Sequence, residues 1–169
     1  MKKTILLLLG ILCLFVHNAK ADHMMGADIK YECLGKEKYK FTFKVYRDCT
    51  GIALPGIWGN ITCKTNTASF TPTKKGVRDI TPTCAGSFSS CKSNPTVGIG
   101  VEEHTFELIV DFSKAPYSNW RKNGCCEFKI GWGQCCRNID ITTMAYSNFY
   151  ADAMVNLCNI DKTKKKCND

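Results

Sequence analysis

The sequence lacks the short patterns that identify most enzymes and metalloproteins. It contains no G-x-S-x-G, H-E-x-x-H or EF-hand pattern and no C-x-x-C pair, and only 3 of its 169 residues are histidine. The segment Gly98-Ile99-Gly100 lacks the third glycine of a dinucleotide-binding loop and precedes a strand-like segment, so it carries no phosphate-binding signal. We therefore expect a protein without catalytic residues, metal or cofactor.

Long apolar runs are equally scarce. The run 5–16 has 12 residues, whereas a membrane-spanning helix needs about 20 apolar residues. Lys2 and Lys3 precede this run and Ala19-Lys20-Ala21 follows it, which is the layout of a secretory signal peptide with a small-x-small cleavage site. The sequence therefore predicts a signal peptide over residues 1–21 and no transmembrane segment after its removal.

A strong excess of one charge is also missing from the predicted domain. Lys and Arg number 23 against 15 Asp and Glu, a net charge of +8, but residues 1–21 and the basic tail 161–169 carry five of these net charges. The remaining cations are scattered along the chain, whereas nucleic-acid binding needs a clustered basic face. We expect no nucleic-acid partner.

Cysteine, by contrast, is abundant. The chain has 12 cysteines, which indicates disulfides formed in an oxidising compartment rather than a zinc site with C-x-x-C or Cys/His spacing. Eleven follow the signal peptide, an odd number, so at least one thiol stays free or bonds to another chain. The disulfide candidates are Cys33, Cys49, Cys63, Cys84, Cys91, Cys125, Cys126, Cys135, Cys136, Cys158 and Cys167.

Spacing along the chain favours two local closures, although spacing alone does not fix the connectivity. Cys84 with Cys91 would close a short loop, and Cys158 with Cys167 would close a loop around the basic tail. Both closures cross only a few residues, so they look geometrically easy.

Other pairings follow from the expected strands. Cys33 with Cys49 would tie the ends of a predicted hairpin. The vicinal pairs Cys125-Cys126 and Cys135-Cys136 flank one predicted strand, and neighbouring residues of a strand point to opposite faces. We therefore expect the two cysteines of each vicinal pair to bond to different partners.

Alternation of apolar and polar residues dominates the rest of the chain. In the segment 38–47, Tyr39, Phe41, Phe43 and Val45 fall on one face and three lysines and a threonine fall on the other, which is typical of a half-buried strand. The same pattern predicts strands over 104–112, 127–132 and 149–157, a hairpin partner over 28–34, and shorter strands near 60–64, 67–71 and 77–81.

No span of 10–15 residues keeps a helical period, and the segment 82–100, rich in Ser, Gly, Pro and Cys, is typical of a long connection. Short strands separated by turn signals predict an all-β fold. We expect one disulfide-stapled antiparallel β-sandwich, immunoglobulin-like, over residues 22–160.

Two groups of residues suggest chemistry or binding. Glu102 and His104 share a strand face and could act as acid and base in a small secreted hydrolase, although a solvated strand start is the favoured interpretation. Trp58, Tyr117 and Trp120 lie in predicted loops, where aromatic side chains can stack on sugars or anchor a protein. Packing over the end of the core is the favoured interpretation of these aromatics.

Several motifs, taken in order, resemble one known family. They are the segments 22–29, 31–35 and 45–49, the strand start 100–104, Trp132 with 135–142, and 149–150 followed by Cys158 and Cys167-Asn168. Together they resemble the N-terminal module of large secreted Bacteroidota proteins that carry a gliding-motility-associated C-terminal domain.

The resemblance implies an immunoglobulin-like or other sandwich-shaped module at the start of an adhesin-like chain, exported by the type IX route with a C-terminal sorting domain. It supplies no catalytic residues. Chains of that family continue into further domains near the position of Asp169, so we expect either a stand-alone module or a fragment.

We therefore expect a secreted, extracellular or cell-surface protein, with the periplasm as the alternative location. Its predicted role is that of a non-catalytic structural or interaction module for an unknown extracellular protein or glycan. The alternatives are a glycan-binding module using Trp58 and Trp120, a hydrolase using Glu102 and His104, and a cysteine-rich effector or inhibitor whose odd thiol bonds to a partner.

Overall fold

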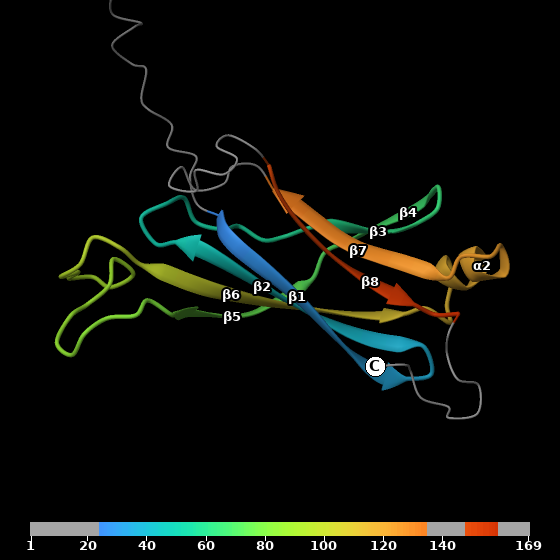
Figure 1. Ribbon diagram of the computed structural model, residues 1–169, viewed down its shortest axis with the longest axis horizontal. Coiled ribbons are helices and arrows are strands. Elements are labelled where there is room, and N and C mark those ends of the chain that lie inside the picture. The colour runs from blue at the N-terminus through green and yellow to red at the C-terminus, as the bar shows by residue number, and fades with distance from the viewer. Residues whose placement is uncertain (1–23, 135–147, 159–169) are drawn as a thin grey trace, which may run out of the picture.

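The computed structural model describes residues 24–134 and 148–158, which form two antiparallel sheets facing each other (Figure 1). The first, sheet A, has the order β1-β2-β6-β5, and the second, sheet B, has the order β4-β3-β7-β8. The expected all-β antiparallel sandwich is confirmed.

The bounds of the elements locate every later residue. Sheet A consists of β1 (Met24–Gly35), β2 (Lys38–Asp48), β6 (Val101–Asp111) and β5 (Thr73–Asp79). Sheet B consists of β4 (Asn66–Phe70), β3 (Gly59–Cys63), β7 (Glu127–Gln134) and β8 (Phe149–Asn156). A short helix, α2 (Tyr117–Lys122), lies between β6 and β7.

The alternation in β2 decides which face becomes the core. Tyr39, Phe41, Phe43 and Val45 are all buried, as predicted. β1 pairs with β2 across Lys36 and Glu37, both of which have positive φ. Such a two-residue turn matches the right-handed twist of the strands that it joins.

Aromatic side chains join the two sheets. Phe43 of β2 lies 5.5 Å from Phe70 of β4, and Phe112, directly after β6, lies 4.8 Å from Phe128 of β7, measured between ring centroids. Buried rings contribute large apolar areas and favourable tilted contacts. The core therefore contains aromatic rings contributed by both sheets.

Two predicted element positions are wrong. The strand expected near 77–81 is β5, which begins earlier, at Thr73, and ends at Asp79. Tyr117 and Trp120, expected in a loop, lie on α2. The expected long connection is confirmed, because no strand or helix interrupts the chain between β5 and β6.

Three disulfides are described: Cys49–Cys91, Cys63–Cys125 and Cys126–Cys158. They indicate folding in an oxidising compartment. The prediction that Cys125 and Cys126 bond to different partners is confirmed. Cys33 is disulfide-bonded as well, in none of these three bridges. Cys135, Cys136 and Cys167 lie outside the described residues.

The local closures are wrong. Cys91 bonds to Cys49 and not to Cys84, which is left as an exposed free thiol. Cys158 bonds to Cys126 and not to Cys167. Antiparallel pairing brings distant parts of the chain together, and this proximity overrides short spacing.

The expected Cys33–Cys49 bond is also wrong, for a geometric reason. Cys33 pairs with Tyr39 beside the hairpin turn, whereas Cys49 follows the far end of β2. Because a strand rises roughly 3.3 Å per residue, the length of β2 separates the two cysteines.

Within the described part of the chain, no helix is long and apolar enough to cross a membrane.

Candidate functional site

A charge cluster of Arg47, Glu102 and His104 lies at one end of the sandwich. Arg47 at the end of β2 is opposite Glu102 near the start of β6, and Val45 is opposite His104. Because side chains alternate along a strand, all three cluster residues continue the inward face of sheet A. His104 is only 3% exposed, so the cluster belongs to the interior. The favoured expectation of a solvated strand start is wrong.

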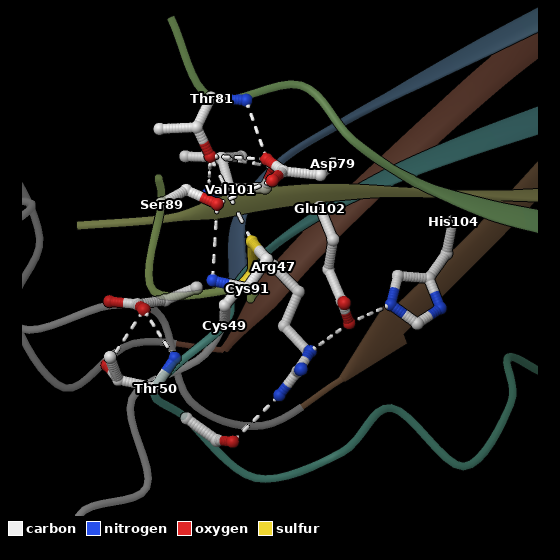
Figure 2. Close-up of a disulfide and its surroundings, with 12 residues drawn as sticks. Arg47, Cys49, Thr50, Asp79, Thr81, Ser89, Cys91, Val101, Glu102 and His104 are labelled. Atoms are coloured by element: carbon white, nitrogen blue, oxygen red, sulfur yellow. Dashed lines mark hydrogen bonds and ion pairs between the residues drawn. A yellow bond between two sulfur atoms is a disulfide. The ribbon is translucent and has the colours of Figure 1, made fainter. Parts of the chain in front are cut away.

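The carboxylate of Glu102 is held by both other members of the cluster (Figure 2). Arg47 Nε donates a hydrogen bond to Glu102 Oε1 at 2.6 Å, and His104 Nε2 contacts the same oxygen. A second guanidinium nitrogen of Arg47, Nη1, donates hydrogen bonds to the backbone carbonyls of Gly51 at 2.7 Å and Ile52 at 2.8 Å. The guanidinium therefore connects the strand pair β2–β6 to the loop 49–58.

The electrostatics of the cluster fix its protonation states at neutral pH. Burial lowers the pKa of His104 and outweighs the opposing effect of Glu102. Burial acts to raise the pKa of Glu102, but hydrogen bonds from Arg47 and His104 prevail and lower it. His104 is therefore neutral with its proton on Nε2, and Glu102 is ionised.

One buried polar atom of the cluster has no hydrogen-bond partner. In this tautomer Nδ1 of His104 carries a lone pair, and that atom is buried without a hydrogen-bond partner. A catalytic base must reach the proton that it removes. A buried Nδ1 and a carboxylate already occupied by two donors do not offer that access.

Glu103 lies on the opposite, outward face of β6. Lys44 Nζ and Arg78 Nε donate hydrogen bonds to its two carboxylate oxygens at 3.1 Å and 2.9 Å. Burial acts to raise the pKa of Glu103, and these two cations lower it by more. The prediction that Glu102 and His104 share a face without Glu103 is confirmed by this geometry.

A second set of hydrogen bonds fastens the base of the loop 80–100. Asp79 accepts hydrogen bonds from Thr81 N at 3.0 Å, Thr81 Oγ1 at 2.6 Å and Ser89 Oγ at 2.5 Å (Figure 2). The hydrogen bonds from Ser89 and Thr81 lower the pKa of Asp79 to about 2. The hydrogen bond from Ser89 thus holds the middle of the loop against Asp79, the last residue of β5.

Gly100 allows the loop to close against β2. Cys49 N donates to Gly100 O, and Ser90 N donates to Ile99 O, both at 3.0 Å. A Cβ at Gly100 would collide with Ser90 and would lie 2.8 Å from Cys91 Sγ. Only glycine lets the Cys49–Cys91 disulfide and the strand start lie this close together.

These contacts define a clamped loop end, made of the loops 49–58 and 80–100. The Arg47 hydrogen bonds and the Cys49–Cys91 disulfide hold the two loops at their bases. Ile52, Phe88 and Ile99 are large apolar side chains of these loops that remain exposed, and Cys84 is an exposed free thiol of the second loop. Exposed apolar side chains on a fixed scaffold are typical of contact sites.

The three predicted binding aromatics do not form one site. Tyr117 and Trp120 pack beneath α2, where the Trp120 ring lies 6.3 Å from Phe128, so the expected packing over the core is confirmed for both. Trp58 is 60% exposed and precedes β3, whose first residue, Gly59, pairs with Trp132. Trp58 and Trp120 therefore belong to opposite ends of sheet B.

Two residues of the site were not predicted from the sequence. Arg47 continues the alternating row of Tyr39 to Val45, so the pattern did place it on the apolar face, where a cation requires a partner. Asp79 carries no comparable signal, because Ser89 reaches it only through the path of the loop.

Comparison of the chain with family models, curated proteins and solved structures finds no match.

Proposed function

We propose that the chain is a secreted or cell-surface, non-catalytic interaction module of an adhesin-like protein. The observation that carries the proposal is the clamped loop end. Its two loops are held at their bases by a disulfide and a buried arginine, while Ile52, Phe88 and Ile99 face solvent. Loops fixed before binding lose less conformational entropy when a partner docks.

The charge cluster supports a structural role over a hydrolytic one. A general acid at neutral pH needs a carboxyl group with a raised pKa. The pKa of Glu102 is lowered instead, because Arg47 and His104 both stabilise its charge. Its hydrogen bonds serve to attach the loop 49–58 to the sheets.

The immunoglobulin-like topology belongs to the same proposal. The sheet orders β1-β2-β6-β5 and β4-β3-β7-β8 correspond to the orders A-B-E-D and C′-C-F-G of an immunoglobulin domain. The chain departs from antibody domains in its disulfides, because the three described here each join segments at the end of one sheet. Export through the predicted signal peptide accords with these disulfides.

A bead-adhesion experiment tests the proposal. Beads coated with the mature chain, residues 22–169, are applied to immobilised extracellular proteins and to cell surfaces. We expect retention of the wild type and loss of retention for the triple variant I52S/F88S/I99S. Ile109→Ser is the control, because Ile109 is equally exposed but lies on β6, away from the loops.

A second arm tests the hydrolytic alternative. Wild type and Glu102→Gln are incubated with chromogenic esters, glycosides and peptides. Turnover by the wild type that the variant loses, while its fold is intact, would replace the proposed function with catalysis. Retention that the triple variant keeps would also contradict the proposal.

A further inference from the structure

The outward face of sheet B carries two glycines in the middle of a strand. β7 reads Gly131-Trp132-Gly133, with Trp132 pointing into the core. Glycine inside a strand costs about 0.5–1 kcal/mol relative to alanine, and it often marks a place where another group approaches the backbone. Here that group is the ring of Tyr150 on β8.

Tyr150 lies along the two glycines. A Cβ at Gly131 would collide with Tyr150 Oη and lie 2.8 Å from Cζ, and a Cβ at Gly133 would lie 3.2 Å from Tyr150 Cδ2. The ring therefore rests against the bare backbone of β7. The side chain is nevertheless 53% exposed, so part of the aromatic ring is offered to solvent.

Hydrogen-bonding groups surround the ring on the same face. Lys129 Nζ lies 5.3 Å from the centroid of the ring and 3.5 Å from Asp152 Oδ2, and Asp152 is opposite Gly131. On the other side of Gly131 lies Asn60, whose Oδ1 accepts a hydrogen bond from Ser69 Oγ at 3.0 Å. The lysine and the aspartate balance each other, so this surface has no net charge.

A second exposed aromatic residue extends the face. Gly59 points inward, because a Cβ there would lie 2.7 Å from Phe70 Cζ and 2.9 Å from Trp132 Cβ. The preceding residue, Trp58, lies just before β3 and is 60% exposed. Gly59 is opposite Trp132, and the next residue of β7, Gly133, is the partner of Tyr150, so Trp58 and Tyr150 both adjoin this end of β7.

We propose that this aromatic face, formed by Tyr150, Trp58, Asn60, Lys129 and Asp152, binds a neutral polysaccharide. A pyranose ring has an apolar C–H side that can lie on an aromatic ring and a rim of hydroxyl groups that can bond to amide, carboxylate and ammonium groups. Tyrosine and tryptophan suit such a mixed surface because they combine a large apolar area with a polar atom.

The chemistry of the face excludes other ligand classes. A small apolar ligand requires a concave pocket that encloses most of its surface, whereas this site lies on the open side of a sheet. A polyanion requires unpaired cations, whereas Lys129 is paired with Asp152. The inference deepens the proposed function by naming a ligand class. Four of its five residues lie on strands of sheet B, and only Trp58 belongs to the loop 49–58.

Affinity gel electrophoresis of the mature chain tests the inference. The gels contain hydroxyethylcellulose, xyloglucan, galactomannan or laminarin as neutral probes, and alginate as the charged control. We expect retardation by at least one neutral polysaccharide and none by alginate. Tyr150→Ala and Trp58→Ala should weaken the binding at least tenfold.

Matched variants separate binding from folding. Tyr31→Ala removes an exposed tyrosine of β1 and should bind as the wild type does. Gly131→Ala keeps both aromatic residues but displaces the Tyr150 ring, so it should also weaken retardation, whereas Gly76→Ala, where no atom lies within 4 Å of the new Cβ, should not. Thermal unfolding of each variant shows whether the fold is retained.

The outcomes distinguish this inference from the proposed function. The triple variant I52S/F88S/I99S should keep its retardation, because none of its three substituted residues belongs to the aromatic face. Absence of retardation by every neutral probe would overturn the inference and leave the loop proposal standing. The inference would also be overturned if the Tyr150→Ala variant folds and is retarded as strongly as the wild type. It would be overturned as well if Tyr150→Ala weakened binding to proteins but not to polysaccharides.

Discussion

Cys49 and Cys91 are separated by 42 residues in the chain, yet their Cα atoms lie 5.0 Å apart and their sulfurs are bonded. The bond joins the end of β2 to the loop that precedes β6, and these two strands are neighbours in sheet A. It therefore holds the long loop to the strand pair that carries the charge cluster.

Removing this disulfide should loosen the loop 80–100. We expect the double variant Cys49→Ser/Cys91→Ser to lose about 2–4 kcal/mol of stability in urea denaturation, because its unfolded state gains conformational freedom. Limited proteolysis should then cut the loop faster. Cys84→Ser is the control, since Cys84 is exposed and unbonded. Equal losses in both variants would contradict the assignment of the bridge.

Glu102 should contribute far more to stability than Glu107, a half-exposed paired glutamate of the same strand. Glu102→Gln removes the charge that compensates buried Arg47, and breaking a buried ion pair in this way costs about 3–5 kcal/mol. Glu107→Gln is the matched control, because Glu107 lies on β6 and pairs with a half-exposed lysine at 3.5 Å. Surface pairs contribute about 0–1 kcal/mol. Similar unfolding free energies for the two variants would show that the cluster is not structural.

Stability should depend on the protonation of His104. Folding lowers the pKa of His104 below 6.5, mainly because burial disfavours the charged form of the ring. Glu102 raises this pKa, but by less than burial and the positive charges of Lys74 and Arg47 together lower it. The unfolded chain then binds the proton more tightly, so this contribution is complete above about pH 6.5 and is lost as pH falls through the folded pKa. Urea denaturation between pH 8 and 5 should show a slope that His104→Gln reduces. Parallel curves for the two proteins would rule out the assignment.

Gly59 should tolerate no side chain. A Cβ there would collide with Gly131 O and lie 2.7 Å from Phe70 Cζ. We expect Gly59→Ala to lower the unfolding free energy by about 1–3 kcal/mol, the usual cost of overpacking a core. Gly76→Ala, with no atom within 4 Å of the new Cβ, should have little effect. A stable Gly59→Ala protein would mean that β3 and β7 are not packed as described.

The alternating pattern was sufficient to predict the strands of the core. In β2 each apolar residue from Tyr39 to Val45 is buried, because the two faces of a strand are set by its own residue order. Weakly patterned segments were predicted less accurately. β5, with the sequence TKKGVRD and mostly exposed side chains, lacks an apolar face, so the start of that strand was misplaced.

The candidate site depended on contacts that no local pattern contains. Glu102 and His104 were found from the sequence, but their partner Arg47 lies 55 residues before Glu102 and meets it only through the pairing of β2 with β6. The same holds for Tyr150, whose role depends on two glycines of the neighbouring strand. Neither contact leaves a mark on the alternation of apolar and polar residues along the chain, so neither was predicted.

By itself, the sequence determined that this protein is a disulfide-rich, all-β chain, because residue order sets the faces of strands and composition sets the class of fold. The tertiary structure alone decided which cysteines bond, which carboxylates are buried and which aromatic residues are exposed. The physical reason is that each of these properties depends on proximity between distant segments, and strand pairing creates that proximity only when the two sheets form.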